Sequence, residues 1–426
     1  MTNNKSVNGN HKISFFSSLK VKLFIFLAVF GPVTITAISD NDAAGVATYS
    51  LAGAKFGYSI LFILLAVTIL LAVTQEMGVR IAMVTGKGLG DLIRERYGIK
   101  ISMLVFLCLF IANQGTVIAN FSALKVTTAL FSIPSLPILI LFAILSIILV
   151  SKGNYKTNQR IFLIGIVLYF SYVLSAFKAG PDWGLALKSM IIPTGIKLSK
   201  EFILASIAVL GTTITPWGQF FVQSFVIDKK LPIKRLKYVQ LETFFGAFLT
   251  DFFSFFMIVA TAATLFVNKI PLISGEQAAL AIKSFAGNLA SLLFGLGLVN
   301  AALMGILIVS LTTAYAFAEF FGVEGSLDAP VEKGKLFYGI FIIQILIAFL
   351  VVCLPSISLF SIVFITQSIN GVLLPFIFYF LLKITNNKEL MGEQINKPVY
   401  NYFVIVSSII IIMAAIFTVV TNIVQF

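Results

Sequence analysis

Long apolar segments recur along this chain, and they constrain its fold more than any other feature. A helix needs about 20 apolar residues to cross the hydrocarbon core of a bilayer. Segments of roughly this length fall at residues 22–52, 57–82, 101–131, 135–151, 159–178, 202–227, 240–267, 284–320, 335–354, 358–384 and 400–425. The sequence therefore predicts an all-α polytopic membrane protein with about 11 transmembrane helices, in which a polar tail (1–20) precedes a single membrane domain (21–426).

The composition and the charge pattern agree with a chain that lies mostly in lipid. Hydrophobic residues make up 59% of it and charged residues 11%. The formal net charge of +13 would suggest nucleic acid for a soluble protein, but here the basic residues gather in loops. Basic loops after the second, fourth and sixth spans predict a multi-pass protein of the cell membrane, with a cytoplasmic N-terminus and an external C-terminus. Only the basic segment 178–201 disagrees with this orientation, which places it outside the cell. We expect no nucleic-acid partner, obligate protein partner or cofactor.

Two spans are interrupted by residues that break helices. "SDNDAAG" (39–45) lies in the first span and "GTTITPWG" (211–218) lies in the sixth. Proline removes a backbone donor and glycine lowers the cost of unwinding. Broken helices at corresponding positions of two halves indicate an inverted-repeat transporter with a site near the bilayer midplane. The predicted repeats are about 22–178 and 202–384, followed by an extra helix at 400–425.

The first interruption places acidic residues where water should be scarce. An ionised aspartate in hydrocarbon costs several kcal/mol, so it usually faces a cavity, a partner or a ligand. Unwound carbonyl groups and nearby hydroxyls would complete an all-oxygen site suited to Mg²⁺, Ca²⁺ or Mn²⁺. The residues that could supply these oxygens are Asp42, Ala43, Gly45, Thr212 and Thr215. The alternative is that Asp40 and Asp42 cap a helix and that the threonines bond back to their own helices.

Five blocks of sequence occur in the order found in one known family. They are "DAAGVATYSLAGAKFGY" (42–58), "VTGKGLGDLIRERYG" (84–98), "GTTITPWGQFFVQS" (211–224), "AYAFAEFFG" (314–322) and "TQSINGVLLPF" (366–376). These blocks resemble the Nramp family, the natural resistance-associated macrophage proteins. The resemblance implies a LeuT-type 5+5 inverted repeat with broken helices 1 and 6, and it implies transport of divalent metals.

The resemblance also implies which residues hold the metal. The family's Asp-Pro-Gly-Asn becomes Asp42-Ala43-Ala44-Gly45, so the aspartate is kept and the asparagine is lost. The family's Met-Pro-His becomes Thr215-Pro216-Trp217, which replaces a soft thioether by a hydroxyl. A glutamine of the tenth span matches Gln367. The predicted metal ligands are Asp42, Ala43, Gly45, Thr212, Thr215 and Gln367.

These substitutions match a divergent branch, the Nramp-related magnesium transporters. For that branch the resemblance implies transport of Mg²⁺ and Mn²⁺, a partly hydrated ion in a widened site, and no coupling to protons. Magnesium dehydrates reluctantly, which agrees with fewer direct ligands. The usual titratable groups are also missing, because the only histidine is His11 and residues 97–181 contain no Asp or Glu.

Other residues are candidates for the ion path or for support of the site, namely Asp40, Asn370, Asp251 and Trp217. Asp251 lies in the seventh span, where it either supports the ion or bonds to a neighbouring helix. Trp217 either packs in the core or closes the cytoplasmic exit. Glu242 is expected to pair with Arg235 or Lys237, close to the loop.

We therefore expect a transporter that imports Mg²⁺, Mn²⁺ or both without proton coupling. The alternatives are proton-coupled Mn²⁺ or Fe²⁺ uptake, an organic-solute symporter in which Asp42 faces a substrate amine, and a metal sensor that does not transport. No enzyme activity is expected. The "GLGD" motif (88–91) of intramembrane proteases lies in a charged loop here, without a tyrosine-aspartate partner in a neighbouring span.

Overall fold

The part of the chain that the structure describes is helical and contains no strand. In this computed structural model, the described residues are 26, 28, 30–196, 199–270, 272, 275–354 and 359–423, so the predicted tail at 1–20 lies outside them. The helices are α2 (Pro32–Ser39), α3 (Ala43–Phe56), η1 (Gly57–Ile60), α4 (Leu61–Thr85), α5 (Leu89–Leu130), α6 (Ser135–Lys152), α7 (Tyr155–Leu168), α8 (Phe170–Lys178), α9 (Trp183–Ile191), α10 (Lys200–Thr213), α11 (Pro216–Asp228), η2 (Ile233–Arg235), α12 (Leu236–Thr261), η3 (Ala262–Phe266), α13 (Gly275–Phe321), α14 (Lys335–Cys353), α15 (Leu359–Thr385), α16 (Lys388–Met391), η4 (Gly392–Gln394) and α17 (Pro398–Ile423).

Ten helical runs among the described residues are long and apolar enough to cross a membrane. The first of them, Ala43–Thr85, contains two helices, because Gly57 has a φ of +60° and interrupts the run between α3 and α4. A side chain at this glycine would also meet the ring of Phe266, at 2.7 Å. The prediction of an all-helical polytopic membrane protein with about 11 spans is therefore confirmed.

Two predicted loops contain helices. The chain after the second span was expected to be a loop, but α5 already begins at Leu89 and is kinked at Gly98, where φ is +78°. The short helix α9 lies between the fifth and sixth spans, and Asp182 caps it by accepting a hydrogen bond from the N–H of Leu185 at 2.9 Å. Local capping and an apolar face are sufficient for such short helices, and a count of apolar residues does not detect them.

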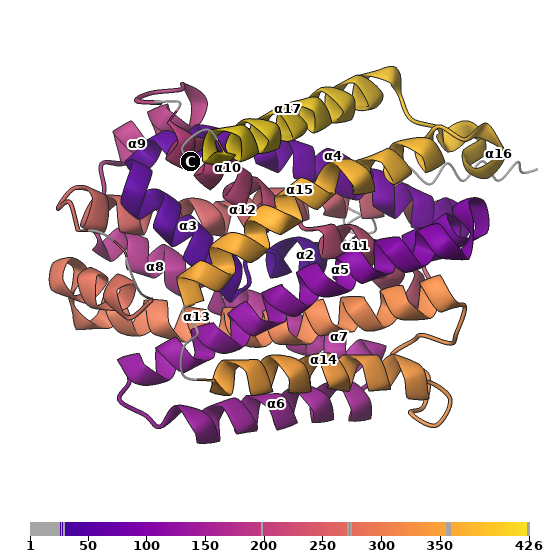
Figure 1. Ribbon diagram of the computed structural model, residues 1–426, viewed down its shortest axis with the longest axis horizontal. Coiled ribbons are helices and arrows are strands. Elements are labelled where there is room, and N and C mark those ends of the chain that lie inside the picture. The colour runs from indigo at the N-terminus through magenta and orange to yellow at the C-terminus, as the bar shows by residue number, and fades with distance from the viewer. Residues whose placement is uncertain are drawn as a thin grey trace, which may run out of the picture.

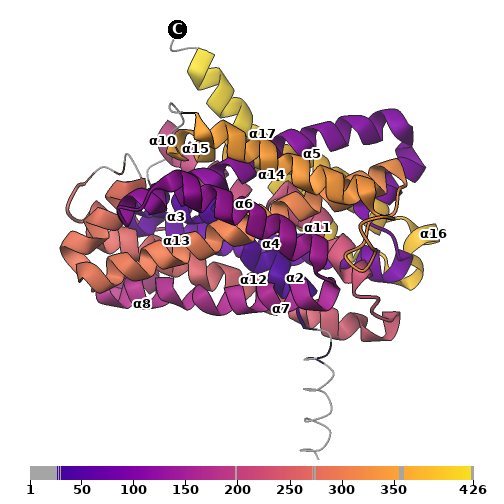
Figure 2. The ribbon, with the colours of Figure 1, turned by 90° about the horizontal axis from the view of Figure 1, so that it is seen from below.

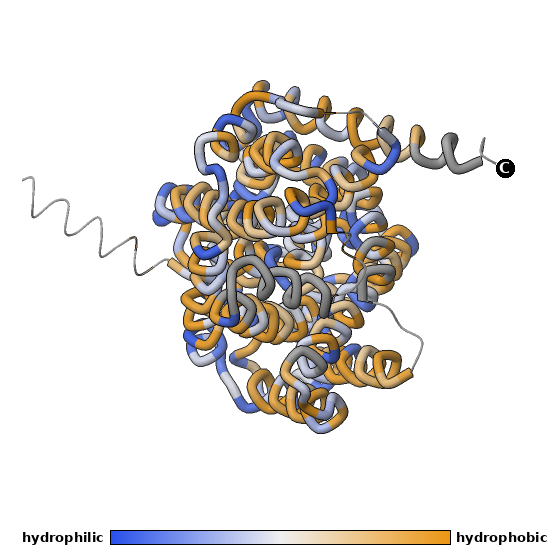
Figure 3. Tube along the Cα trace, turned by 90° about the vertical axis from the view of Figure 1, so that its left-hand side faces the viewer, coloured by the Kyte–Doolittle hydropathy of each residue, from blue (hydrophilic) through white to orange (hydrophobic). Residues whose placement is uncertain are grey.

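The broken helices lie inside the bundle. In Figure 1, α2 is at the centre, while α17 lies along one edge beside α15, and α6 and α14 lie along the opposite edge. The most apolar stretch of α12 is 72% buried, whereas that of α17 is 11% buried. Figure 2 shows α17 leaving the bundle toward the C-terminus, and Figure 3 shows hydrophobic residues along the outer helices, as expected for a lipid-facing surface.

Basic residues at the start of α7, where the sequence predicted a loop, meet those of the loop after α11 at one end of the bundle. They line a cavity of about 790 Å³ with basic side chains from Lys156, Arg160, Lys229 and Lys230. Lys229 donates a hydrogen bond to the carbonyl oxygen of Phe30, at 2.9 Å, and burial lowers its pKa to about 8. This end of the molecule is called the basic-loop end below.

At the basic-loop end, Glu242 of α12 holds the start of α2. Its Oε1 accepts hydrogen bonds from the backbone N–H groups of Gly31, Val33 and Thr34, at 2.7, 3.1 and 3.0 Å. The expectation that Glu242 pairs with Arg235 or Lys237 is therefore wrong, and the basic residue that acts on it is Lys229. The positive end of α2 needs acceptors for its free N–H groups, and a buried carboxylate supplies them.

Candidate metal site at the two helix breaks

The break between α2 and α3 covers residues 40–42 and is fixed to its neighbours by Asn41. The Asn41 amide nitrogen donates to the carbonyl oxygen of Thr250, at 2.7 Å, and its amide oxygen accepts from the hydroxyl of Ser254, also at 2.7 Å. Tyr169 donates to the carbonyl oxygen of Asn41, at 2.9 Å. Because Asn41 is bonded through its side chain and its backbone, the break is a defined structure rather than a frayed helix end.

Asp42 caps α3 and is only 2% exposed. Its Oδ1 accepts a hydrogen bond from the N–H of Gly45 at 2.8 Å, and its Oδ2 accepts one from the amide of Asn120 at 2.7 Å. The Asn120 oxygen in turn accepts from the N–H of Ala43 at 2.9 Å. The helix start and the amide both favour a charged carboxylate here. A carboxylate has about four acceptor positions, so two remain for a cation.

The break between α10 and α11 brings Thr215 against Asp40. The Thr215 hydroxyl donates to Asp40 Oδ1 at 2.8 Å and accepts from the N–H of Gly218 at 3.0 Å. Asp40 is 1% exposed, and its Oδ2 has no hydrogen-bond partner in the described part of the chain. The positive end of α11 therefore faces this acid, and Thr215 joins the two breaks directly.

Thr212 lies beside Gly45 and has an unpaired hydroxyl. A Cβ atom on Gly45 would lie 2.5 Å from the carbonyl oxygen of Asp40 and 3.3 Å from the hydroxyl of Thr212. The Thr212 side chain is fully buried, and its oxygen has no partner among the residues described. The missing side chain at Gly45 thus lets a carbonyl and a hydroxyl oxygen approach the same face of α3.

Two glycines let α10 cross α15 closely, which brings Gln367 next to this face. A Cβ atom on Gly211 would lie 2.2 Å from the carbonyl oxygen of Gln367 and 2.6 Å from the nitrogen of Gly371. The amide of Asn370 donates to the side-chain oxygen of Gln367 at 3.0 Å. The Asn370 oxygen is buried without a partner in the described chain. Since Thr212 follows Gly211, the crossing places the Thr212 and Gln367 backbones side by side.

Replacing Gly211 with alanine is expected to force these two helices apart. The new methyl group would meet backbone atoms, which cannot rotate away, so we expect a loss of about 1–3 kcal/mol in stability. Thermal unfolding of the purified protein in detergent measures this loss. Gly339→Ala on α14 is the matched control, because no atom lies within 4 Å of the added Cβ. An equal response of both variants would contradict the close crossing.

The structure corrects two of the predicted metal ligands. The carbonyl groups of Ala43 and Gly45 were expected to be freed by unwinding, and this is wrong because α3 begins at Ala43. A helix start leaves N–H groups free, whereas its carbonyls bond along the helix. The carbonyl oxygen near Thr212 belongs instead to Asp40. The alternative prediction, that Asp42 caps a helix, is correct for its Oδ1, which accepts the hydrogen bond from the N–H of Gly45.

Asp251 and Trp217 are both buried near the breaks. Asp251 is 5% exposed, and neither of its carboxylate oxygens has a hydrogen-bond partner in the part described, although Thr68 and Ser254 lie beside it. Because Thr68 belongs to α4, this proximity favours the predicted interaction of Asp251 with a neighbouring helix. Trp217 is fully buried in the main hydrophobic core, which favours the packing role.

Sequence reasoning missed Asn41, Asn120 and Tyr169, which hold the first break. A signal existed for Asn120, because Asn113 and Asn120 are seven residues apart in an apolar span and thus lie on one helix face.

The described residues contain no group of three or more His, Cys, Asp or Glu side chains that could hold a metal ion. A cation at the breaks would therefore depend on one or two carboxylates together with neutral oxygens, a donor set typical of hard cations.

Broken helices buried at the centre of an apolar helical bundle are typical of the LeuT-type fold. The solved structure of MhsT in complex with L-phenylalanine is similar in fold, with a TM-score of 0.56 and 15% identity over 93% of this chain and 98% of that one. A crystal structure of the Eremococcus coleocola manganese transporter is more similar, with a TM-score of 0.75 and 17% identity over 91% of this chain and 85% of that one. The predicted fold class is thereby confirmed.

The family profile described as "Natural resistance-associated macrophage protein-like" matches residues 33–421, so the chain belongs to the Nramp family. It is 25% identical over 383 residues to the divalent metal cation transporter MntH of Yersinia pestis, covering 87% of this chain and 90% of that protein. It is 24% identical over 404 residues to the natural resistance-associated macrophage protein 2 homolog of Dictyostelium discoideum. That match covers 92% of this chain but 62% of the longer relative. The family is one of transporters, not enzymes.

Proposed function

We propose that this protein transports a divalent metal cation across the membrane and binds it between the two helix breaks. The observation that carries the proposal is Asp42, a buried carboxylate with acceptor positions to spare, whose Oδ1 binds the N–H of Gly45, the residue that the unpaired hydroxyl of Thr212 also approaches. The proposed ligands are the side chains of Asp42, Thr212 and Gln367 and, in addition, the carbonyl oxygen of Asp40. Thr215 positions Asp40, and Asn370 orients Gln367.

The ion is proposed to be Mn²⁺ or Mg²⁺. The relatives named as a manganese transporter and a divalent metal cation transporter support Mn²⁺. The donors around the breaks are carboxylate, hydroxyl, amide and carbonyl oxygens, which also suit Mg²⁺ when part of its water shell is kept. The proposed site contains no sulfur or imidazole ligand that would favour a softer metal over magnesium.

The direction proposed is uptake into the cytoplasm, with the basic-loop end and the N-terminus inside and the C-terminus outside. A membrane potential of about 100 mV, negative inside, supplies roughly 4.6 kcal/mol per divalent ion, since each charge contributes about 2.3 kcal/mol. Uptake is therefore favourable without a coupling ion.

A second candidate is proton-coupled transport of Mn²⁺ or Fe²⁺. The named relatives favour this candidate in the choice of ion. Within this chain it is favoured by Asp251, a buried acid with no hydrogen-bond partner in the described residues. The first candidate is favoured by the lack of acidic residues in the third span and by the single histidine, His11, outside the spans.

Liposomes that contain the purified protein, a metal-sensitive dye and a pH-sensitive dye distinguish these candidates. We expect Mn²⁺ and Mg²⁺ to enter without proton movement, both in the wild-type protein and in Asp251→Asn. Entry of Mn²⁺ but not Mg²⁺, with protons that no longer move in Asp251→Asn, would support the coupled candidate instead. No metal flux in either direction would contradict the proposed function.

A further inference from the structure

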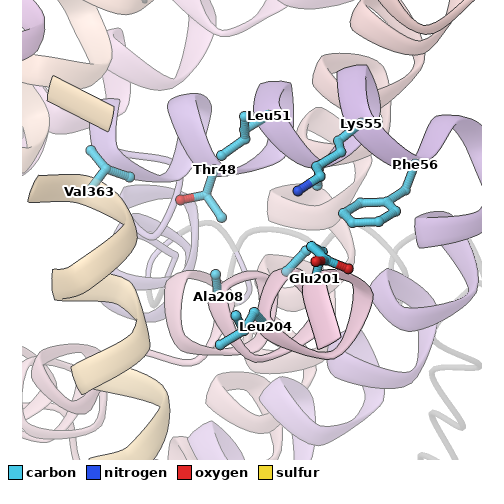
Figure 4. A pocket seen from close by; sticks show the side chains of 10 residues that line it. Thr48, Leu51, Lys55, Phe56, Glu201, Leu204, Ala208 and Val363 are labelled. Atoms are coloured by element: carbon cyan, nitrogen blue, oxygen red, sulfur yellow. The ribbon is translucent and has the colours of Figure 1, made fainter. Parts of the chain in front are cut away.

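A cavity of about 130 Å³ lies next to the candidate site, on the side away from the basic loops. Its walls come from α3, α10 and α15, the same three helices that carry the proposed ligands (Figure 4). Thr48, Ala208 and Val363 lie at its inner end. The cavity therefore shares its walls with the site but is lined by different residues.

Helical register places the floor of this cavity one turn from the site. Thr48, Ala208 and Val363 are four residues from Ala44, Thr212 and Gln367, respectively, and one helical turn rises about 5.4 Å. The Thr48 hydroxyl also donates to the carbonyl oxygen of Ala44, at 2.8 Å. Thr48 is 5% exposed, and Ala208 and Val363 are 2% exposed. About one helical turn thus separates the inner lining of the cavity from the site.

Two opposite charges face each other across the mouth of the cavity. Figure 4 shows Lys55 of α3 and Glu201 of α10 on facing walls of the cavity. They interact electrostatically, but they do not form one of the ion pairs that the described residues make. The Lys55 ammonium group lies 5.7 Å from the ring centre of Phe56, which itself packs edge-on against Phe202 at 5.2 Å. Lys55 therefore lies near an aromatic ring, while the exposed Glu201 carboxylate interacts with Ser199, with its own backbone N–H and with the charges of Lys55 and Lys200.

We propose that this cavity is the mouth through which the cation reaches the site, with Glu201 as its first protein contact and Lys55 as the charge that it displaces. This inference rests on the proposed function. With Lys55 and Lys200 both near Glu201, the mouth attracts cations weakly. An arriving divalent cation outcompetes the single charge of Lys55 for Glu201, because the Coulomb attraction is proportional to charge. Lys55 can then move aside over Phe56 without being buried.

Initial rates of Mn²⁺ uptake into liposomes, measured against Mn²⁺ concentration at low and high salt, test this role. We expect Glu201→Gln to raise KM about five- to tenfold at low salt with the maximal rate unchanged, because Lys55 and Lys200 then repel the ion without an opposing negative charge. Lys55→Gln is expected to lower KM by a similar factor. Both effects should shrink at high salt, since the charges are exposed to solvent.

The double variant Lys55→Gln with Glu201→Gln shows whether the two charges act on the same ion. We expect Glu201→Gln to raise KM by a smaller factor in the Lys55→Gln background than in the wild-type protein. The effects of two charges that act on the same ion are not additive. Lys188→Gln on α9 is the matched control, because it removes an exposed positive charge outside the lining of the cavity.

Two outcomes would separate the inference from the proposed function. If wild-type protein moves Mn²⁺ but Glu201→Gln and Lys55→Gln keep a KM within twofold of the Lys188→Gln control, the mouth lies elsewhere and the inference is overturned. If the wild-type protein moves no divalent cation, the proposed function itself fails.

Discussion

Replacing Asp42 with asparagine is expected to reduce divalent-cation transport at least a hundredfold. The asparagine oxygen can still cap α3, since Asn and Asp are about equally good caps, so the helix should remain. The substitution removes the negative charge that we propose binds the cation. The new amide of residue 42 also faces the donating amide of Asn120. Losing a charged ligand of a buried ion costs about 3 kcal/mol or more, which corresponds to this change in flux.

The fold must survive for this result to be informative. Asp182→Asn is the matched control, because Asp182 also caps a helix through one carboxylate oxygen but lies on the exposed helix α9. We expect this control to transport at the wild-type rate. Thermal unfolding of both variants should differ from wild type by no more than a few degrees. Normal flux in Asp42→Asn would remove Asp42 from the proposed site.

Replacing Glu242 with alanine is expected to cause the largest loss of stability, on the order of 3–5 kcal/mol. The substitution removes the acceptor of three backbone N–H groups at the start of α2 and leaves them in a buried region. α2 has only eight residues, so it cannot compensate through its own hydrogen bonds. Unfolding temperature and amide hydrogen exchange of residues 33–39 measure the effect.

Two further variants separate this capping role from general damage. Glu242→Gln keeps an oxygen acceptor without the charge, and it is expected to lose about half as much stability. Glu332→Ala removes an exposed glutamate in the loop before α14 and should change nothing. If the amides of α2 exchange no faster in Glu242→Ala than in Glu332→Ala, Glu242 does not hold this helix.

The number and type of spans could be predicted from sequence because apolar length is a local property. The length of an apolar segment fixes whether a helix can cross a bilayer, whatever its neighbours are. The helical start of α5 and the short helix α9 could not be predicted this way, since both depend on local capping and on packing beneath polar surfaces. The inverted repeat with extents of about 22–178 and 202–384 stays a prediction.

The two breaks could be located from sequence, but their internal geometry could not. Pro216, the glycines and the two aspartates marked the segments that cannot continue as helix. Where the helix restarts depends on partners far away in sequence, such as Asn120 for Ala43 and Thr250 for Asn41. This is why the backbone oxygens were assigned to Ala43 and Gly45 rather than to Asp40.

Crystals of the protein grown with Mn²⁺ and measured at the manganese absorption edge test the central claim most directly, because anomalous scattering locates the ion itself. We predict one strong peak between the two breaks, within about 2.5 Å of a carboxylate oxygen of Asp42 and near the hydroxyl of Thr212. The peak should disappear in crystals of Asp42→Asn. A peak at another place in the bundle, with none between the breaks, would contradict the account.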